Sequence, residues 1–166
     1  MLELIVGNGC SLLATVTDTI SSTRKTAKGV LLSQTASQVF YCVGAIVLGG
    51  YTAAVQNGVS IVRNLLAISS KSYKWIEWLL VILGVVLGIV FNTLGLMGWL
   101  PIIAGTEYSL AVFRFKNDER KLKWAFALCI GLYTIFNFAI QNYVGAASNL
   151  FVCIATVGLL LKKENK

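Results

Sequence analysis

Histidine is absent from this sequence, and only seven acidic residues stand against fourteen basic ones. The chain therefore lacks the commonest general base and metal ligand, and it contains no close carboxylate pair, CxxC motif or phosphate-binding loop. Its four cysteines lie far apart within apolar segments, a pattern that predicts free thiols acting as small apolar side chains. We therefore expect no enzymatic activity, no metal and no cofactor. The cysteines are Cys10, Cys42, Cys129 and Cys153.

Charge of either sign is scarce as well. Charged residues make up 13% of the chain, hydrophobic residues make up 57%, and the mean hydropathy is +0.76. A soluble domain carries about 25% charged residues. Apolar runs recur along the whole chain, each near the ~20 residues that a helix needs to cross a bilayer. The first run opens with Glu3 and ends in basic residues, unlike a cleavable signal peptide. We expect an all-α integral membrane protein.

Basic residues mark one side of this membrane protein. They fall in or beside the loops after the first, third and fifth apolar runs and in the tail, and the other three loops have none. Since basic residues collect on the cytoplasmic side, this pattern predicts an external N-terminus and a cytoplasmic C-terminus. It also explains the net charge of +7 without nucleic-acid binding. The seven predicted transmembrane helices cover about residues 4–22, 30–49, 51–69, 75–93, 99–115, 122–140 and 143–161.

An internal repeat emerges when the chain is shifted by 92 positions. The shift places Tyr41 on Tyr133 and Asn57 on Asn149, and it aligns the first three helices with the last three. The fourth helix remains as a linker, which gives a 3+1+3 plan of two parallel three-helix bundles. Repeats of this kind are typical of transporters, whose solute site lies at the repeat interface. The predicted units are residues 1–71, 72–97 and 98–166.

The 3+1+3 plan resembles that of the SWEET sugar transporters and their relatives, the PQ-loop and PnuC-type proteins. In SWEET-like proteins an asparagine on the third helix of each bundle lines the solute pocket, above an aromatic residue from the second helix. The pairs Asn57 with Tyr41 and Asn149 with Tyr133 stand at similar spacing. The resemblance implies alternating-access transport of a small neutral or zwitterionic polar solute, such as a sugar, vitamin or nucleoside. This chain departs from the pattern in having tyrosine for tryptophan and a single proline, Pro101.

A second resemblance covers nearly the whole chain. The segment LGGYTAAVQNGVSIVRNL at residues 48–65 is similar to the most recognisable segment of the YgjV-like family of small bacterial inner-membrane proteins. The basic turn before the second helix is similar too. This resemblance implies that the chain lies in the bacterial inner membrane, where small proteins of this fold often form homo-oligomers.

Polar residues within the predicted helices are the candidate functional residues. The amides of Asn57 and Asn149 offer a donor and an acceptor to a neutral solute, or they hydrogen-bond between helices as structural contacts. Tyr41 and Tyr133 would shape the pocket beneath them. Gln38 and its neighbour Gln34 form a polar stripe, which is either a solute path or a packed network.

Three charged residues are candidates for a gate or for ion coupling. Asp18 and Arg63 lie at similar predicted depth and would pair, either as an inner gate or as a fixed bridge; Arg63 could also snorkel to the interface. Glu107 lies mid-helix, where a charge is expensive, so it would couple protons or stay protonated in a hydrogen bond. The rival function is a receptor or scaffold that uses the same fold without transport.

Overall fold

The computed structural model describes residues 2–69, 73–139 and 142–164. The expected unit boundary between residues 71 and 72 lies outside the described part. Among the described residues five helices are long and apolar enough to cross a membrane; α3 carries a polar face and α4 has only 17 residues. The helices are α1 (Leu2–Thr23), α2 (Ala27–Val47), α3 (Tyr51–Ile68), α4 (Lys74–Val90), the short η1 (Gly95–Gly98), α5 (Trp99–Phe115), α6 (Glu119–Ala139) and α7 (Tyr143–Glu164).

The observed helix boundaries follow the predicted ones closely, with one systematic difference. Helices α2 and α6 begin about three residues earlier than hydropathy predicts, because each has a capping residue. Thr26 accepts a hydrogen bond from the Gly29 N–H at 3.1 Å, and Asp118 accepts from the N–H groups of Arg120 and Lys121. Such caps satisfy free N–H groups of the first turn. The Lys121 backbone N–H and side chain hold the pKa of Asp118 below its usual value.

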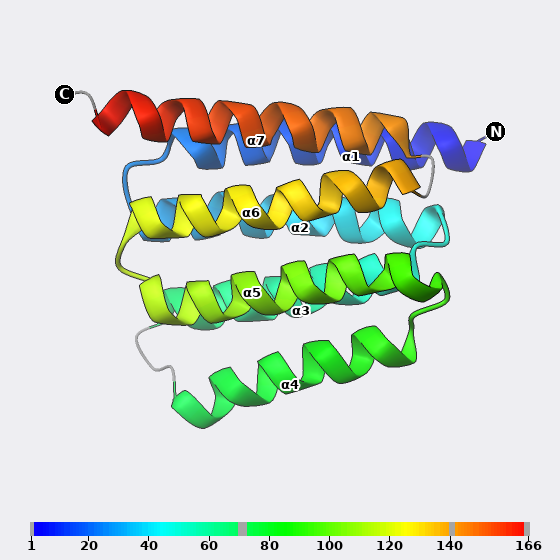
Figure 1. Cartoon of the computed structure of the whole chain (residues 1–166), viewed down its shortest axis with the longest axis horizontal. Coiled ribbons are helices and arrows are strands. Elements are labelled where there is room, and N and C mark those ends of the chain that lie inside the picture. Colours follow the sequence, from blue (N-terminus) through cyan, green and yellow to red (C-terminus); the bar gives the residue numbers. More distant parts are fainter. Residues whose placement is uncertain (1, 70–72, 140–141, 165–166) are drawn as a thin grey trace.

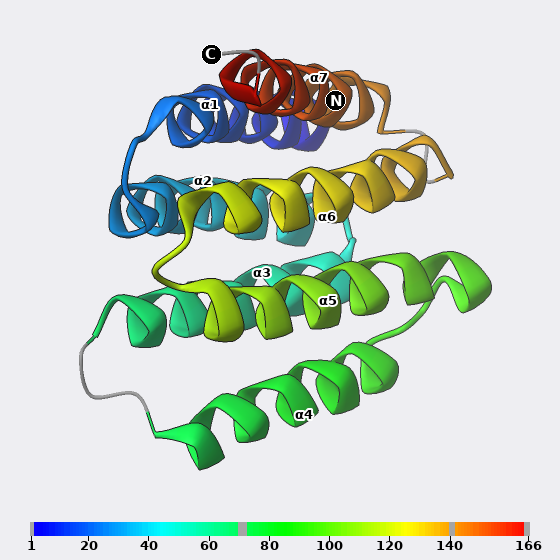
Figure 2. The ribbon, with the colours of Figure 1, turned by 60° about the vertical axis from the view of Figure 1, so that its left-hand side comes forward.

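Six helices of the described part of the chain form two facing rows (Figures 1 and 2). One row is α1, α2, α3 and the other is α7, α6, α5; α1 packs on α7 and α3 packs on α5, while α4 closes the side between α3 and α5. Successive helices run in alternating directions, so the N- and C-termini lie at opposite ends of the molecule. We call the end with the α1–α2 and α5–α6 loops the basic end, and the end with the α2–α3 and α6–α7 turns the corner end.

Repeat symmetry is visible in the helix boundaries. Helix α2 spans Ala27–Val47, and 92 positions later α6 spans Glu119–Ala139. The starts of α3 and α7, the ends of α1 and α5, and the caps Thr26 and Asp118 are related by the same shift. The helix contacts of the two halves correspond as well. The α1–α2 contact matches α5–α6, the α2–α3 contact matches α6–α7, and the α1–α7 contact matches α3–α5. The weak sequence repeat therefore corresponds to equivalent local structure in both halves.

Helix α4 is attached to this pair of rows by two side chains of α3. Thr52 donates a hydrogen bond to the Phe91 carbonyl, and Gln56 Nε2 donates to the Gly84 carbonyl, both at 2.7 Å. Two α4 glycines, Gly84 and Gly88, are buried there and leave room for the Gln56 side chain. Small residues at helix contacts are typical of membrane proteins. The opposite face of α4 exposes large apolar side chains, as expected of a lipid-facing linker: Trp75, Trp78, Leu79, Ile82, Val86 and Val90.

Candidate functional site

A narrow cavity of about 70 Å³ lies between the two rows of helices. Residues of α1, α2, α3, α5, α6 and α7 line it. All four residues predicted to contact solute are among them: Asn57, Asn149, Tyr41 and Tyr133. The cavity extends from the corner end to the middle of the helices, and it is smaller in this conformation than the ~300–1000 Å³ of a drug-sized pocket. Several water molecules or a solute of a few non-hydrogen atoms fit this space.

The two halves of the chain contribute equivalent positions to this cavity. Seven lining residues of α2, α3 and the turn between them have a counterpart 92 positions later that also lines it. The cavity therefore lies on the axis that relates the two halves, as expected for a site at a repeat interface. The pairs are Gln38 and Ile130, Tyr41 and Tyr133, Gly44 and Phe136, Ala45 and Asn137, Gly50 and Asn142, Ala53 and Gly145, and Asn57 and Asn149.

The asparagine–tyrosine pairing differs from the one that sequence spacing predicts. Tyr41 donates a hydrogen bond of 3.0 Å to the Oδ1 atom of Asn149, across the interface between the rows. The ring of Tyr133 packs instead edge-on against Phe136, with the ring centroids 6.5 Å apart. Spacing along one chain segment could not reveal a contact between residues 108 positions apart.

Asn57 differs from its counterpart Asn149 because its amide lacks a hydrogen-bond partner in the described part of the chain. It is 6% exposed and lines the cavity, and within the described residues its side chain makes no hydrogen bond. Gln38 also lines the cavity, and its buried Oε1 atom lacks a partner among the described residues. Buried polar groups are normally paired with protein, water or ligand. The cavity wall therefore presents amide groups that are free to bind a polar molecule.

The predicted ion pair between Asp18 and Arg63 is not formed. Asp18 lines the cavity from α1 and accepts a hydrogen bond from the Ser37 hydroxyl of α2. Arg63 is 1% exposed and donates hydrogen bonds to Asn64 of α3 and Ser109 of α5. Helix positions in the sequence predict similar depth for Asp18 and Arg63, but they could not show that α2 and α5 supply other hydrogen-bond partners. Nor does Arg63 snorkel to the interface.

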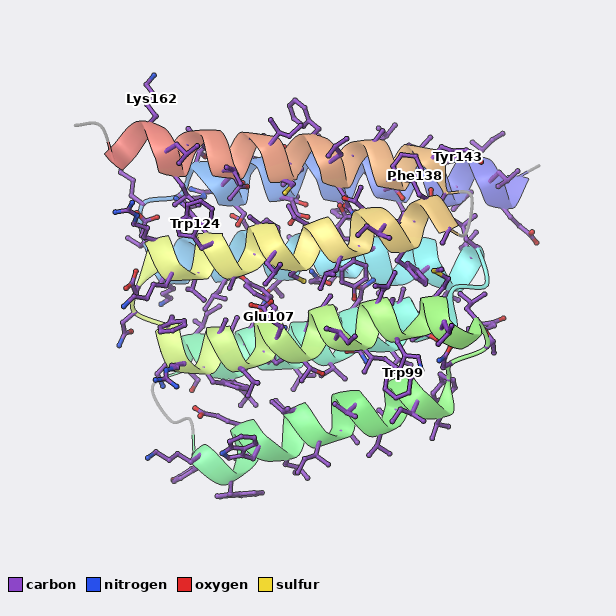
Figure 3. All side chains as sticks on the ribbon, viewed as in Figure 1. Trp99, Glu107, Trp124, Phe138, Tyr143 and Lys162 are labelled. Atoms are coloured by element: carbon purple, nitrogen blue, oxygen red, sulfur yellow. The ribbon has the colours of Figure 1, made fainter. Side chains whose placement is uncertain are left out.

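Glu107 lies outside the cavity lining. It sits midway along α5 (Figure 3), and its Oε2 atom is buried without a hydrogen-bond partner among the described residues. Its carboxyl therefore does not contact a solute held between Asn57 and Asn149. Trp99 and Trp124 lie near opposite ends of the molecule, as expected of interfacial tryptophans.

Sequence reasoning missed the residues that end the cavity in the middle of the helices. Tyr108, Phe126, Cys129 and Ile130 line it there. They also belong to a buried apolar cluster, the core cluster, which continues toward the basic end through Leu31, Ala67, Val112 and Leu122. Leu31 and Ala67 in turn line a second hollow of about 440 Å³ at the basic end. The core cluster thus separates two hollows, and no linear motif marks it.

Comparison with known families identifies the chain's relatives. Residues 5–163 match the sequence profile of Imp-YgjV, a family described as bacterial inner membrane protein. The chain belongs to this family. The Imp-YgjV match agrees with the resemblance of residues 48–65 to the YgjV-like segment. It also agrees with the five helices that are long and apolar enough to cross a membrane in the described part of the chain. Neither the curated proteins nor the solved structures that were compared gave a match.

Proposed function

We propose that this Imp-YgjV protein transports a small polar solute across the bacterial inner membrane by alternating access. The solute would bind between two pseudo-equivalent three-helix bundles, α1–α3 and α5–α7, with α4 as the linker. Asn57 and Asn149 would supply the polar contacts, and Tyr41 and Tyr133 would shape the site. The observation that carries this proposal is the cavity lined by equivalent positions of both repeats, in which the Asn57 amide makes no hydrogen bond to any residue that the structure describes.

The arrangement along the membrane normal supports the same mechanism. The cavity lies toward the corner end, the core cluster lies below it, and the second hollow opens at the basic end. A solute would pass when the two rows move relative to each other and the core cluster separates. Because most contacts between the rows are between α1 and α7 and between α3 and α5, such a movement can leave the packing within each row intact.

The decisive experiment is solute uptake into proteoliposomes that contain the purified protein. We expect saturable, time-dependent accumulation of one class from a panel of labelled sugars, vitamins, nucleosides and amino acids, above the level of protein-free liposomes. Binding of a panel member without accumulation would favour a receptor and overturn transport. The absence of both binding and uptake across the panel would also contradict the proposal.

The same proposal places the corner end outside the cell and the basic end in the cytoplasm, because the lysine and arginine residues cluster at the basic end. A green fluorescent protein fused after Lys166 is therefore expected to fluoresce, since it folds well in the cytoplasm and poorly after export. Alkaline phosphatase fused at the same position should be inactive. Active phosphatase together with a dark fluorescent fusion would reverse the orientation.

A further inference from the structure

Arg63 is a buried cation that forms no ion pair within the described part of the chain, although the Glu107 carboxyl on α5 is near enough to act on it electrostatically. The Arg63 side chain lies 1% exposed between α3 and α5, one helical turn from Ser60 of the cavity lining. It forms no ion pair with any described residue. A buried charge is costly unless it is paired, so this guanidinium needs another explanation.

The neighbours of Arg63 leave hydrogen-bond donors in excess. Arg63 Nε and Nη2 donate to Asn64 Oδ1 at 3.0 and 2.9 Å, and Nη1 donates to Ser109 Oγ at 3.1 Å. A guanidinium can only donate, so these bonds fix the Asn64 amide with its Nδ2 group turned away. That Nδ2 atom is buried and has no partner among the described residues.

Gln34 adds a second unpaired donor to the same network. The Tyr108 hydroxyl donates to Gln34 Oε1 at 2.5 Å, which leaves Gln34 Nε2 buried and unpartnered in the described structure. The guanidinium lies over the Tyr108 ring, 4.7 Å from its centroid. Tyr108 is thus the contact between this donor-rich layer and the cavity, since its side chain lines the cavity as well.

The hollow on the other side of the core cluster also carries mainly positive side chains. The hollow at the basic end is lined by Lys25, Lys28 and Lys116, with Glu119 the acidic residue among its lining residues. A molecule passing from the cavity to this end would meet Arg63 first and the three lysines afterwards. Such a route is unfavourable for a cation and favourable for an anion.

We propose that the transported solute carries a carboxylate, which Arg63 and the free amide N–H groups of Asn64 and Gln34 bind when Tyr108 moves aside. A carboxylate supplies two acceptor oxygens to a guanidinium and to neighbouring donors. The inference rests on the proposed function and narrows its solute class to organic acids and zwitterions with a carboxylate. Asp18, on the α1 wall of the cavity and bonded to Ser37, does not compete for Arg63.

The test uses acetate and acetamide, which have similar size and differ in charge. Thermal unfolding of the purified full-length protein in detergent is measured against each compound and against methylammonium, at constant ionic strength. We expect acetate to stabilise the protein saturably, with an apparent Kd about tenfold or more below that of acetamide, because a charge-assisted bond is worth about 1.5–3 kcal/mol. Methylammonium should have no saturable effect.

Variants separate a binding role from a structural one. Arg63→Gln should reduce the acetate effect to that of acetamide, Arg63→Lys should retain part of the preference, and Arg114→Gln removes an exposed charge as a matched control. Equal effects of acetate and acetamide on the wild type, or no effect of either, would overturn the assignment even if Arg63→Gln fails to fold. If the protein prefers acetate but no solute is transported, the transport proposal fails and the carboxylate site stands. If only uncharged solutes are transported, the transport proposal stands and the carboxylate site fails.

Discussion

Asn57→Ala should lower solute flux at sub-saturating concentration by about ten- to a hundredfold while leaving thermal stability unchanged. Asn57 makes no hydrogen bond with the described protein, so its removal breaks no internal contact. It deprives the bound solute of one donor and one acceptor, which together are worth about 1.5–3 kcal/mol. Flux into proteoliposomes and the unfolding midpoint in detergent are measured on the same preparation.

The counterpart variant, Asn149→Ala, separates binding from structure. Asn149 accepts a hydrogen bond from the hydroxyl of Tyr41. This variant should therefore lose solute flux. It should also lose about 0.5–1 kcal/mol of stability, the usual value of an interhelical hydrogen bond in membranes. Thr93→Ala, at an exposed position after α4 that lines neither hollow, is the control for both measurements. Loss of stability without loss of flux in Asn57→Ala would make this residue structural and contradict its role in binding.

Gly88→Ala should destabilise the protein by about 2 kcal/mol or more, the range for extra atoms forced into a packed core. A Cβ atom at Gly88 would lie 2.6 Å from Gln56 Nε2 and 2.7 Å from Ile102 Cγ1. Neither atom can withdraw freely, since Gln56 is bonded to the Gly84 carbonyl and Ile102 is 2% exposed. The substitution therefore pushes α4 away from α3 and α5, and heating in detergent should reveal a lower unfolding midpoint.

Gly131→Ala in α6 is the matched control, because a Cβ atom there would meet nothing within 4 Å. Replacing a helical glycine where space is available should leave stability unchanged or raise it by up to about 1 kcal/mol. The two substitutions add the same atom to a helical glycine, and they differ in the packing around it. Equal midpoints for both variants would show that α4 is not held by the close contact at Gly88.

Much of the fold followed from hydropathy and charge. Helix α5 spans the predicted residues, and α3 and α7 start at the predicted residues Tyr51 and Tyr143. These boundaries are predictable because a bilayer requires apolar runs of fixed length and admits few polar interruptions. The early starts of α2 and α6 were not predicted, since Thr26 and Asp118 cap helices that extend into charged segments where hydropathy is low.

Part of the candidate site was also predictable. Asn57, Asn149, Tyr41 and Tyr133 were named from the repeat, and the structure places all four around one cavity. The repeat predicts this because equivalent positions of related helices face a common axis. Their contact with a solute stays a prediction.

The sequence by itself determined that the chain is helical and lies in the membrane, and its weak internal repeat predicted equivalent helix boundaries in the two halves. Those properties depend on composition and on local order, which bilayer thickness and chain periodicity fix. Tertiary structure decided the partners: Tyr41 bonds the asparagine of the other repeat, Asp18 and Arg63 stay apart, and Tyr108 separates Arg63 from the cavity. Each of these contacts joins distant helices, and their choice depends on helix rotation and packing, which no single segment encodes.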